Sequence, residues 1–479
     1  MRRLLAILLA ALVALPSFVV TPAFAQIAEE RKMGDEFVGE AIAHMPLIHD
    51  YELAGFLREL GGKLVATLGQ QPFEYEFFVV QDDDINAFSV PGGKLFANAG
   101  LISRVDSEDA LAGVIGHEIG HAAAHHLVRQ QQKGAAANYA SLLGLLLGII
   151  NPALAIGSLA AGQAAQLSYQ RDFEREADYL GIEYARKAGY DPSAMMSLLR
   201  ELGAEEALNP TKIPPYVLTH PMSTERLTNL EAVLGRHEWD PSKATASWRL
   251  RRAQAIARAY SQSRDQCVPE YERKLEAATP AQRPEYLELI GILMSHGEEY
   301  DSAEKYLKEA ESSGRNVDRE LGRAEYHLGH FDEARTRLNR VIEKTPQDWD
   351  TLADLASIDA QEGNYAAASI KLKKSVELEP YRANVLLAYA RSLGKSGHED
   401  QGMYWMGRTS EAQGASRQAI EYYKKSLEKL AKDDPLRDDI KKRTDKLGEH
   451  IIKDNAEQGG GPGAPGGPAG GPVGGSVPH

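Results

Sequence analysis

A single spacing limits the folds open to the C-terminal half of this chain. Three kinds of residue recur there at intervals of 34 positions: Gly329, Gly363 and Gly397; Ala334 and Ala368; Pro346 and Pro380. A fixed period of this length indicates a supersecondary unit that cannot bury its apolar face alone and therefore stacks on its copies. We expect a superhelical stack of helix pairs with a concave groove, and not a second globular core.

The period and residue usage resemble those of tetratricopeptide repeats. The segment HLGHFDEA, which ends at Ala334, aligns with QEGNYAAA, which ends at Ala368. Further units around 297–303 and 414–419 have irregular spacing, as is usual near the ends of an array. We therefore assign residues 271–455 to an α-solenoid of tetratricopeptide repeats, 241–270 to a connecting helix, and 456–479 to a Gly/Pro-rich tail that we expect to be disordered.

The N-terminal part of the chain indicates a separate, mainly helical domain with a small sheet, which we place at residues 26–240. A chain of 479 residues is too long for one compact core. Residues 75–80 (YEFFVV) have strand composition, and residues 86–101 contain a Pro-Gly-Gly turn typical of a hairpin. Residues 108–129 form a strong helix pattern with acidic and capping residues at the start.

The first 25 residues predict export from the cytoplasm. Arg2 and Arg3 precede an apolar run, and Ala23-Phe24-Ala25 provides a small-x-small cleavage site. This order is typical of a cleaved secretory signal peptide, here residues 1–25. Cys267 is the only cysteine, so no intrachain disulfide can form and stability must come from packing. The bacterial periplasm fits these features best.

Charge and apolarity restrict the surfaces that this protein can bind. The net charge of -14 argues against nucleic acid as a partner, because such binding requires basic patches. Residues 134–170 contain no charged residue, but Asn151-Pro152 and several glycines interrupt the apolar runs. We expect a helical hairpin there that packs on the domain or makes peripheral contact with a membrane, rather than a full span.

The segment His117-Glu118-Ile119-Gly120-His121 is an HExxH motif inside the expected helix 108–129. Residues four apart share one helix face, so His117 and His121 can bind the same zinc ion while Glu118 points toward the same metal site. His125 lies two turns from His117, on the order of 12 Å along the axis, too far for a shared ligand. We expect His125 and His126 to be solvated or capping residues.

The third ligand is best sought in the segment Glu174-Arg175-Glu176-Ala177-Asp178. Glu174 and Asp178 share a helix face, whereas Glu176 points away from it. Glu174 as a ligand would leave Asp178 one turn away, able to accept a hydrogen bond from a ligand histidine. A charged solvent-exposed face is the alternative for this segment, and it would be preferred if HExxH were absent.

Together, HExxH and ExxAD resemble the motifs of gluzincin peptidases of the CAAX prenyl protease type. Other matching segments are NAF at 86–88, PGGK at 91–94 and HPMSTERL at 220–227, so the resemblance covers about residues 30–235. It implies a zincin-like helical peptidase domain with one zinc ion and Glu174 as third ligand. The order of signal peptide, peptidase domain and repeats is also similar to that of periplasmic proteases of outer-membrane β-barrel assembly. This similarity implies the outer-membrane β-barrel assembly machinery as a possible partner.

These residues suggest a mechanism for peptide-bond cleavage. Zinc would activate a water molecule and Glu118 would act as the general base. His220 and Arg226 are candidate electrophiles for the oxyanion, and the strand at Asn86 could pair with an extended substrate. His220 lies in a Pro-rich loop (IPPYVLTHP), so it could instead occupy the fourth zinc position and gate the site. The alternatives predict opposite effects of removing its imidazole.

We therefore expect an exported zinc metalloendopeptidase that acts on misfolded or stalled outer-membrane proteins in periplasmic quality control. The repeats would dock polypeptide substrates or partners. An alternative from a different class is a periplasmic chaperone or scaffold that works through its repeats and keeps a latent metal site. A complete HExxH/ExxAD set favours the enzyme.

Overall fold

The computed structural model describes residues 22–133, 171–208, 214–221, 223–235 and 247–458. Three expectations fall outside these ranges: the leader up to residue 21, the uncharged stretch 134–170, and the tail from residue 459. Within the described ranges, none of the helices combines the length and the apolarity needed to cross a membrane. The fold is mainly helical with one small sheet, which confirms the expected fold class.

The sheet has four strands in the order β1-β2-β4-β3, where β1 is Leu47–Ile48, β2 Glu76–Val80, β3 Ala87–Val90 and β4 Lys94–Asn98. β2 and β4 run parallel, whereas β3 and β4 form the expected antiparallel hairpin. Gly92 and Gly93 in its turn both have φ of 76°, a conformation that favours glycine. The hairpin leaves β3 at the edge of the sheet.

Helices cover the sheet on both faces. Helix α2 (Pro22–His44) begins before the proposed cleavage site and inserts Phe37 against a stack in which the Phe96 ring lies between Phe78 and Phe88. Helices α3 (Tyr51–Val65) and α5 (Glu108–Ala123) close the opposite face with aliphatic side chains. The short helix α4 (Ala99–Arg104) follows β4 directly. These layers bury α5 in the interior.

The expected helix 108–129 is divided into two. Helix α5 ends at Ala123, His125 adopts a left-handed conformation with φ of 54°, and α6 (His126–Lys133) starts in a new direction. The His125 ring meets the buried carboxylate of Glu30 on α2, with 2.7 Å between Nδ1 and Oε2. A contact from a distant helix thus accompanies a break that the local pattern did not predict.

In the described part of the N-terminal domain, four further helices and a 3₁₀ turn follow α6. They are α9 (Arg171–Lys187), η2 (Pro192–Ala194), α10 (Met195–Leu208), α11 (Pro215–Thr219) and α12 (Thr224–Leu234). Helix α9 packs along α5, and α12 packs on α9. The ExxAD segment and the His220 loop therefore approach the HExxH helix from one side.

The C-terminal half is a chain of antiparallel helices that pack in sequence order. They are α13 (Trp248–Ser261), α14 (Arg264–Ala277), α15 (Arg283–His296), α16 (Tyr300–Ser312), α17 (Asp318–His327), α18 (Phe331–Lys344), α19 (Trp349–Gln361), α20 (Tyr365–Leu378), α21 (Ala383–Lys395), α22 (Glu399–Ala412), α23 (Ser416–Lys429) and α24 (Leu436–Gln458). Each contacts mainly its neighbours, as expected of a solenoid.

The 34-residue glycine period has a conformational cause. Gly329, Gly363 and Gly397 each follow the first helix of a pair with φ between 81° and 93°, where a side chain would be strained. In the earlier unit Glu298 takes this left-handed position with φ of 61°, which explains why the glycine spacing is irregular there. Helix α24 reaches Gln458, three residues into the segment assigned to the tail.

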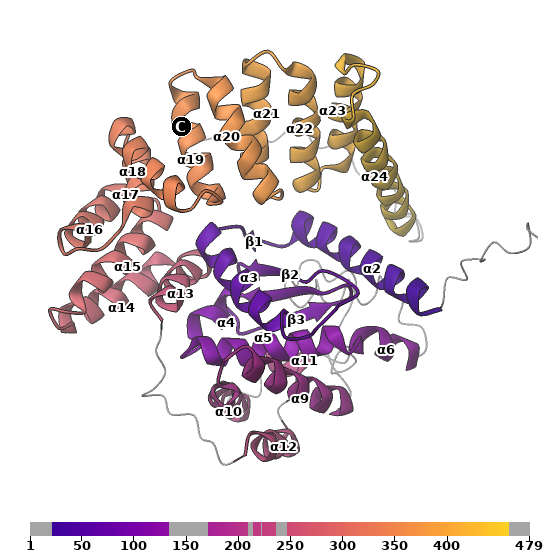
Figure 1. The fold of residues 1–479 in the computed structure, drawn as a ribbon, viewed down its shortest axis with the longest axis vertical. Coiled ribbons are helices and arrows are strands. Elements are labelled where there is room, and N and C mark those ends of the chain that lie inside the picture. The colour runs from indigo at the N-terminus through magenta and orange to yellow at the C-terminus, as the bar shows by residue number, and fades with distance from the viewer. Residues whose placement is uncertain (1–21, 134–170, 209–213, 222, 236–246, 459–479) are drawn as a thin grey trace, which may run out of the picture.

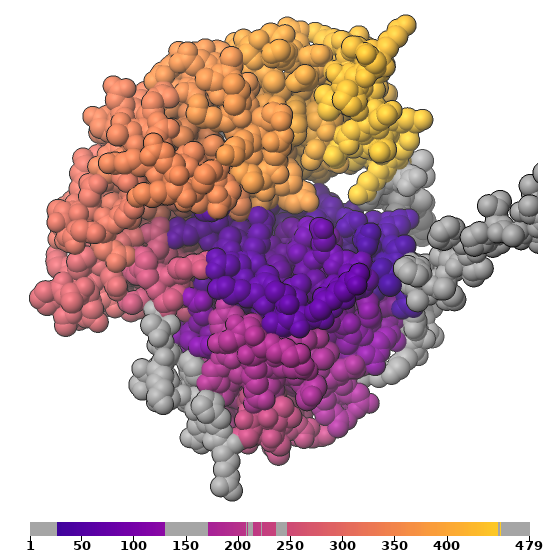
Figure 2. Space-filling model, viewed as in Figure 1, coloured from indigo at the N-terminus to yellow at the C-terminus, as the bar shows by residue number. Residues whose placement is uncertain are grey.

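The repeats curve around the N-terminal domain. In Figure 1 helices α19–α24 arch over α2 and α3, and α13–α15 flank α3 and α4. The space-filling view shows the repeats in orange and yellow seated on the indigo sheet domain (Figure 2). A hydrogen bond and an ion pair join the repeats to the N-terminal domain. Trp349 donates its Nε1 proton to the carbonyl of His49 at 2.8 Å, and Arg58 pairs with buried Glu379 at 2.6 Å.

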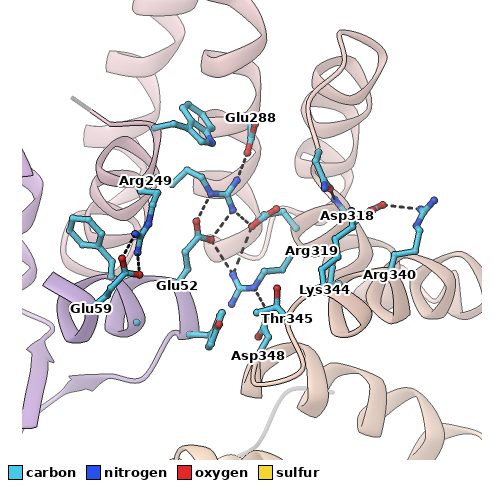
Figure 3. A pocket seen from close by; sticks show the side chains of 18 residues that line it. Glu52, Glu59, Arg249, Glu288, Asp318, Arg319, Arg340, Lys344, Thr345 and Asp348 are labelled. Carbon is cyan, nitrogen blue, oxygen red and sulfur yellow. Dashed lines mark hydrogen bonds and ion pairs between the residues drawn. The ribbon is translucent and has the colours of Figure 1, made fainter. Parts of the chain in front are cut away.

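A buried set of charges, which we call the junction network, joins α3 to the repeats beside a cavity of about 480 Å³. Its members are Glu52 on α3, Arg252 on α13, Glu288 on α15, and Arg319 and Glu320 on α17. Arg252 contacts all three carboxylates. Arg319 lies 3.4 Å from Glu52, and both are labelled in Figure 3. The network attaches the solenoid to a helix that itself packs on α5.

Candidate metal centre

Glycines let the two motif helices approach closely. A Cβ atom on Gly116 of α5 would lie 3.0 Å from the Gly181 carbonyl oxygen, and one on Gly120 would lie 2.9 Å from that of Ala177. A Cβ on Gly181 of α9 would come within 2.7 Å of the His117 backbone nitrogen. Any larger residue would push α9 away from α5. The Gly in HEIGH therefore sets the depth at which the ExxAD carboxylates reach the histidines.

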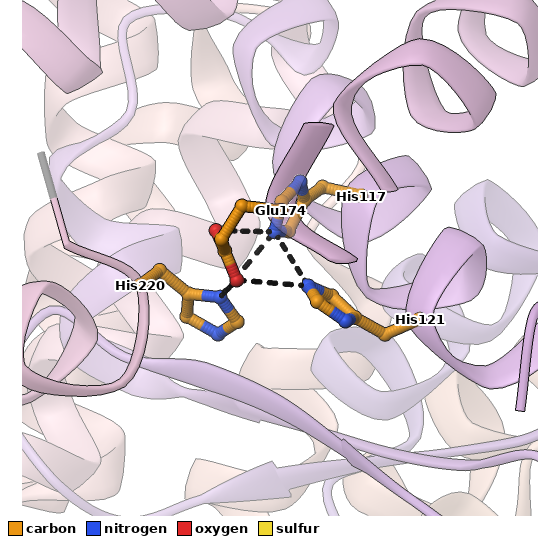
Figure 4. A group of neighbouring side chains, drawn as sticks. All are labelled: His117, His121, Glu174 and His220. Atoms are coloured by element: carbon orange, nitrogen blue, oxygen red, sulfur yellow. Dashed lines mark hydrogen bonds and ion pairs between the residues drawn. The ribbon is translucent and has the colours of Figure 1, made fainter. Parts of the chain in front are cut away.

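Four side chains converge at this crossing: His117, His121, Glu174 and His220 each offer one ligand atom, all within 4.8 Å of one another. The Nε2 atoms of His117 and His121 are 3.0 Å apart, and Oε1 of Glu174 is 3.3 Å from Nε2 of His121 (Figure 4). All four side chains are buried. The structure thus brings together the proposed ligands from three separate segments.

His220 lies inside the cluster and not in an outlying loop. Its Nδ1 is 3.1 Å from Oε1 of Glu174 and 3.3 Å from Nε2 of His117. The Tyr216 ring packs on it with centroids 4.6 Å apart. Burial works to lower the pKa of His220, but the charges of Glu174 and Glu118 outweigh it and raise the pKa.

Glu118, the expected general base, lies beside the cluster. Its side chain is buried, and its Oε1 lies 3.3 Å from Nε2 of His220. Its Oε2 has no hydrogen-bond partner among the described residues. Burial raises the pKa of Glu118 above the usual range of a carboxyl group. Tyr216 also belongs to this site, although the sequence analysis did not single it out. Its buried hydroxyl likewise lacks a partner in the described structure. The only indication in the sequence was its position four residues before His220.

Asp178 and Arg226 form a layer behind the ligands. Oδ1 of Asp178 lies 2.8 Å from Nδ1 of His117, while Arg226 contacts both oxygens of Asp178 and, at 2.7 Å, Oε2 of Glu174. Burial opposes ionisation of these carboxyls, but Arg226 outweighs it; the pKa of Asp178 falls to about 2 and that of Glu174 lies well below its usual range. Both stay ionised at neutral pH.

The expectation for His126 is wrong. The ring is neither solvated nor at a cap: it is fully buried, and its Nδ1 lies 2.9 Å from Nδ1 of His121. Burial lowers its pKa. The break at His125 is the physical reason, because in a continuous helix residue 126 would point away from His121. The sequence carried no signal for that break.

Asn86 precedes the edge strand β3. Its side chain is buried with Oδ1 unpartnered among the described residues, and its carbonyl accepts from the backbone N–H of Asn98 at 2.9 Å. All four residues of β3 are buried as well, and the strand packs against α5. A substrate strand could add to this edge only after the covering groups move aside.

The donor set fits a metal ion. Imidazole nitrogens and carboxylate oxygens face one another at 3.0–3.5 Å, so their lone pairs require a proton or a cation between them. Two histidines, one glutamate and a fourth position suit zinc, which prefers tetrahedral nitrogen and oxygen ligands. The buried and unpartnered Oε2 of Glu118 leaves an acceptor directed at the same site.

Comparison with known proteins agrees with this geometry. Residues 53–234 match peptidase family M48. Similar curated proteins include the beta-barrel assembly-enhancing proteases of Yersinia pestis (29% identical, over 59% of this chain and 59% of that protein) and of Escherichia coli strain K12 (34%, over 42% and 43%). The mitochondrial metalloendopeptidase OMA1 of Schizosaccharomyces pombe is 28% identical over 44% of this chain and 61% of that protein.

The chain spans about half the length of the curated relatives it matches. The matched region contains the HExxH helix α5, the ExxAD helix α9 and His220, which are the elements that build the cluster. Residues 53–234 therefore form a domain similar to those of peptidase family M48.

Proposed function

We propose that this protein is a zinc metalloendopeptidase exported to the periplasm. The observation that carries the proposal is the convergence of His117, His121, Glu174 and His220, whose ligand atoms lie within 4.8 Å of one another. The M48 match and the metalloendopeptidase relatives support the same reaction class. His117, His121 and Glu174 are the ligands, and a single zinc ion is the cofactor.

Zinc bound there would supply Lewis acidity, which acidifies water and polarises a carbonyl group. The protein's own contribution begins with Glu118. This carboxylate takes the proton from the attacking water and delivers it to the leaving amine. Burial raises its pKa, which brings the carboxyl closer to the pH at which it must both accept and release a proton. Glu118 and the four side chains of the cluster are buried, which limits the access of competing water.

Arg226 is a positioning residue in this scheme and not the oxyanion electrophile. Its guanidinium is held by Asp178 and Glu174, whose two negative charges it partly neutralises. By pinning Asp178 against Nδ1 of His117, it keeps the Nε2 of that ring available for the metal. His220 remains the available side-chain electrophile once its ring withdraws from the ligand position.

In this proposal, His220 acts as the gate of the metal site. Its Nδ1 lies 3.1 Å from Oε1 of Glu174 and 3.3 Å from Nε2 of His117, and its Nε2 faces the base Glu118. A neutral imidazole in that place would fill the fourth zinc position and engage the general base at once. Together with the buried edge strand, this describes a latent peptidase that must open before a chain can enter.

The substrates that we propose are polypeptides, misfolded or stalled during outer-membrane β-barrel assembly, as the names of the relatives suggest. An extended substrate would pair with β3 near Asn86, a backbone contact that imposes little sequence specificity. The solenoid would dock clients or the assembly machinery, and residues 134–170 would make peripheral membrane contact. A latent site also keeps open a second role as a chaperone acting through the repeats.

One experiment tests the function and separates it from the chaperone role. Zinc content and casein cleavage are measured for the wild type, Glu118→Gln and the control Glu201→Gln, which lies at an exposed position of α10. We expect bound zinc in all three and cleavage lost only in Glu118→Gln, by about 10²–10⁴-fold. A zinc-loaded wild type without cleavage, even when His220→Ala opens the site, would leave the scaffold role; absence of zinc would refute the metal site.

A further inference from the structure

A series of hydrogen-bonded side chains leads from the proposed ligand His121 toward the surface. Nδ1 of His121 lies 2.9 Å from Nδ1 of His126, and Nε2 of His126 lies 3.1 Å from Oε2 of Glu176. The same oxygen accepts a hydrogen bond from Arg129 at 2.9 Å. His126 is fully buried, whereas the Glu176 side chain is 43% exposed. Unlike His117, which a carboxylate backs directly, His121 is backed by an imidazole.

The hydrogen-bonding capacity of these groups fixes where each proton lies. An ionised carboxylate only accepts, so Glu176 requires a proton on Nε2 of His126. A neutral ring with its proton on Nε2 has a lone pair on Nδ1, which must then accept from Nδ1–H of His121. His121 is left with an unprotonated Nε2, and this atom is the one that faces Nε2 of His117 and Glu174.

We propose that His126 and Glu176 form a relay that sets the tautomer of His121 and orients its Nε2 toward the metal. The proposal rests on the metal site of the proposed function and adds two positioning residues to it. Outer carboxylates on ligand histidines serve this purpose in zinc sites generally. Here the carboxylate of Glu176 does not contact the ligand histidine directly. His126 lies between them and passes on the proton position that Glu176 imposes.

The surroundings hold the His126 ring in the required orientation. It stacks on Phe173 with centroids 4.5 Å apart and planes 16° from parallel. The Arg129 guanidinium lies 4.8 Å from the centre of the same Phe173 ring and also binds Glu176. The left-handed turn at His125 aims α6 so that its first residue faces His121. Packing therefore limits the rotation of the relay's central ring.

Two substitutions separate a relay from a packing role. His126→Phe keeps the ring that stacks on Phe173 but removes the acceptor. His126→Asn loses the ring but places an amide oxygen where Nδ1 was, able to accept from His121. A relay predicts a zinc affinity about 10–100-fold weaker in His126→Phe and largely retained in His126→Asn. A packing role predicts the reverse order, and that result would overturn the proposal.

Glu176 and a neighbouring histidine provide graded controls. Glu176→Gln should weaken zinc binding less than His126→Phe, because water can replace an acceptor that is partly exposed. His125→Asn removes the contact with Glu30 but tolerates the left-handed backbone, and it should leave zinc affinity unchanged. Affinities are measured by competition with a chelator at fixed pH, without reference to peptidase activity.

Nitrogen-detected NMR of histidine-labelled, zinc-loaded wild type tests the relay without any substitution. We expect protons on Nδ1 of His121 and on Nε2 of His126. A proton on Nδ1 of His126 would contradict the relay even if a variant fails to fold. The proposed function fails separately, because in that case the wild type itself would bind no zinc, whereas equal affinities of wild type and His126→Phe would refute only the relay.

Discussion

The metal cluster and the junction network are both buried groups of charged and titratable side chains, but they are assembled in opposite ways. In the junction network each carboxylate of Glu52, Glu288 and Glu320 meets the guanidinium of Arg252. In the metal cluster, histidine nitrogens and Glu174 face one another with only Arg226 as a permanent cation, and an oxygen of Glu118 has no partner in the described structure.

The difference separates a structural set of charges from a functional one. A buried ion pair with its partner present is internally compensated and binds nothing further. Lone pairs that converge on one point repel one another until a cation or proton binds between them. The stability of such a cluster therefore depends on a bound ligand. The junction network therefore joins the domains, while the cluster is poised for metal. Four substitutions test this division.

The largest effect is expected from Glu174→Ala. Loss of a ligand should weaken zinc binding by more than the 10–100-fold typical of outer-shell partners. Glu176→Ala on the same helix is the matched control, with a smaller loss because Glu176 acts only through His126. Chelator competition measures both. If Glu176→Ala were the weaker binder, the ligand assignment would be wrong.

The junction should respond in stability and not in metal binding. Arg252→Met removes the shared cation of two buried carboxylates, Glu288 and Glu320, and of part-buried Glu52, so we expect about 3–5 kcal/mol less free energy of unfolding. Arg249→Met is the control, since its pair with Glu59 is half-exposed and should contribute under about 1 kcal/mol. Denaturant titration of the zinc-loaded protein measures both. Unchanged stability in Arg252→Met would remove the distinction between the two regions.

His220→Ala tests whether the cluster is gated. Removing the ring frees the fourth position and Glu118, so cleavage of an unstructured peptide should rise while zinc remains on three ligands. An essential oxyanion donor would instead give a loss of about 10²–10³-fold in turnover. Steady-state kinetics with one fluorogenic peptide decides between them. A fall of that size would assign His220 to the transition state rather than to the gate.

The smallest expected effect is the loss of the Glu52 contribution to stability at acidic pH. Burial opposes ionisation of Glu52, but Arg252 and Arg319 outweigh it and lower its pKa from 4.5 to about 2. A depressed folded-state pKa contributes stability above the unfolded-state pKa and loses it as pH falls toward the folded-state value. The stability difference between wild type and Glu52→Gln should thus stay constant from pH 7 to 5 and shrink between about pH 4.5 and 2. Melting curves measure it; a constant difference down to pH 2 would contradict the shifted pKa.

Short-range geometry follows from the amino-acid sequence alone. The three-residue gap in HExxH places His117 and His121 on one face of α5, since helical periodicity alone fixes that face. The spacing of Glu174 and Asp178 works in the same way on α9. The recurring glycines predicted the repeats because a left-handed turn after the first helix of a pair favours glycine.

Contacts between distant segments were decided only by the tertiary structure. Nothing local indicated that His125 would turn left-handed against Glu30, or that His126 would thereby reach His121. Nothing local indicated that Arg226, a candidate electrophile, would lie between two carboxylates. Periodicity fixes which side chains share a face because it depends on one helix alone. Which helix faces pack against each other depends on many segments of the chain, so these contacts are determined only when the whole core forms.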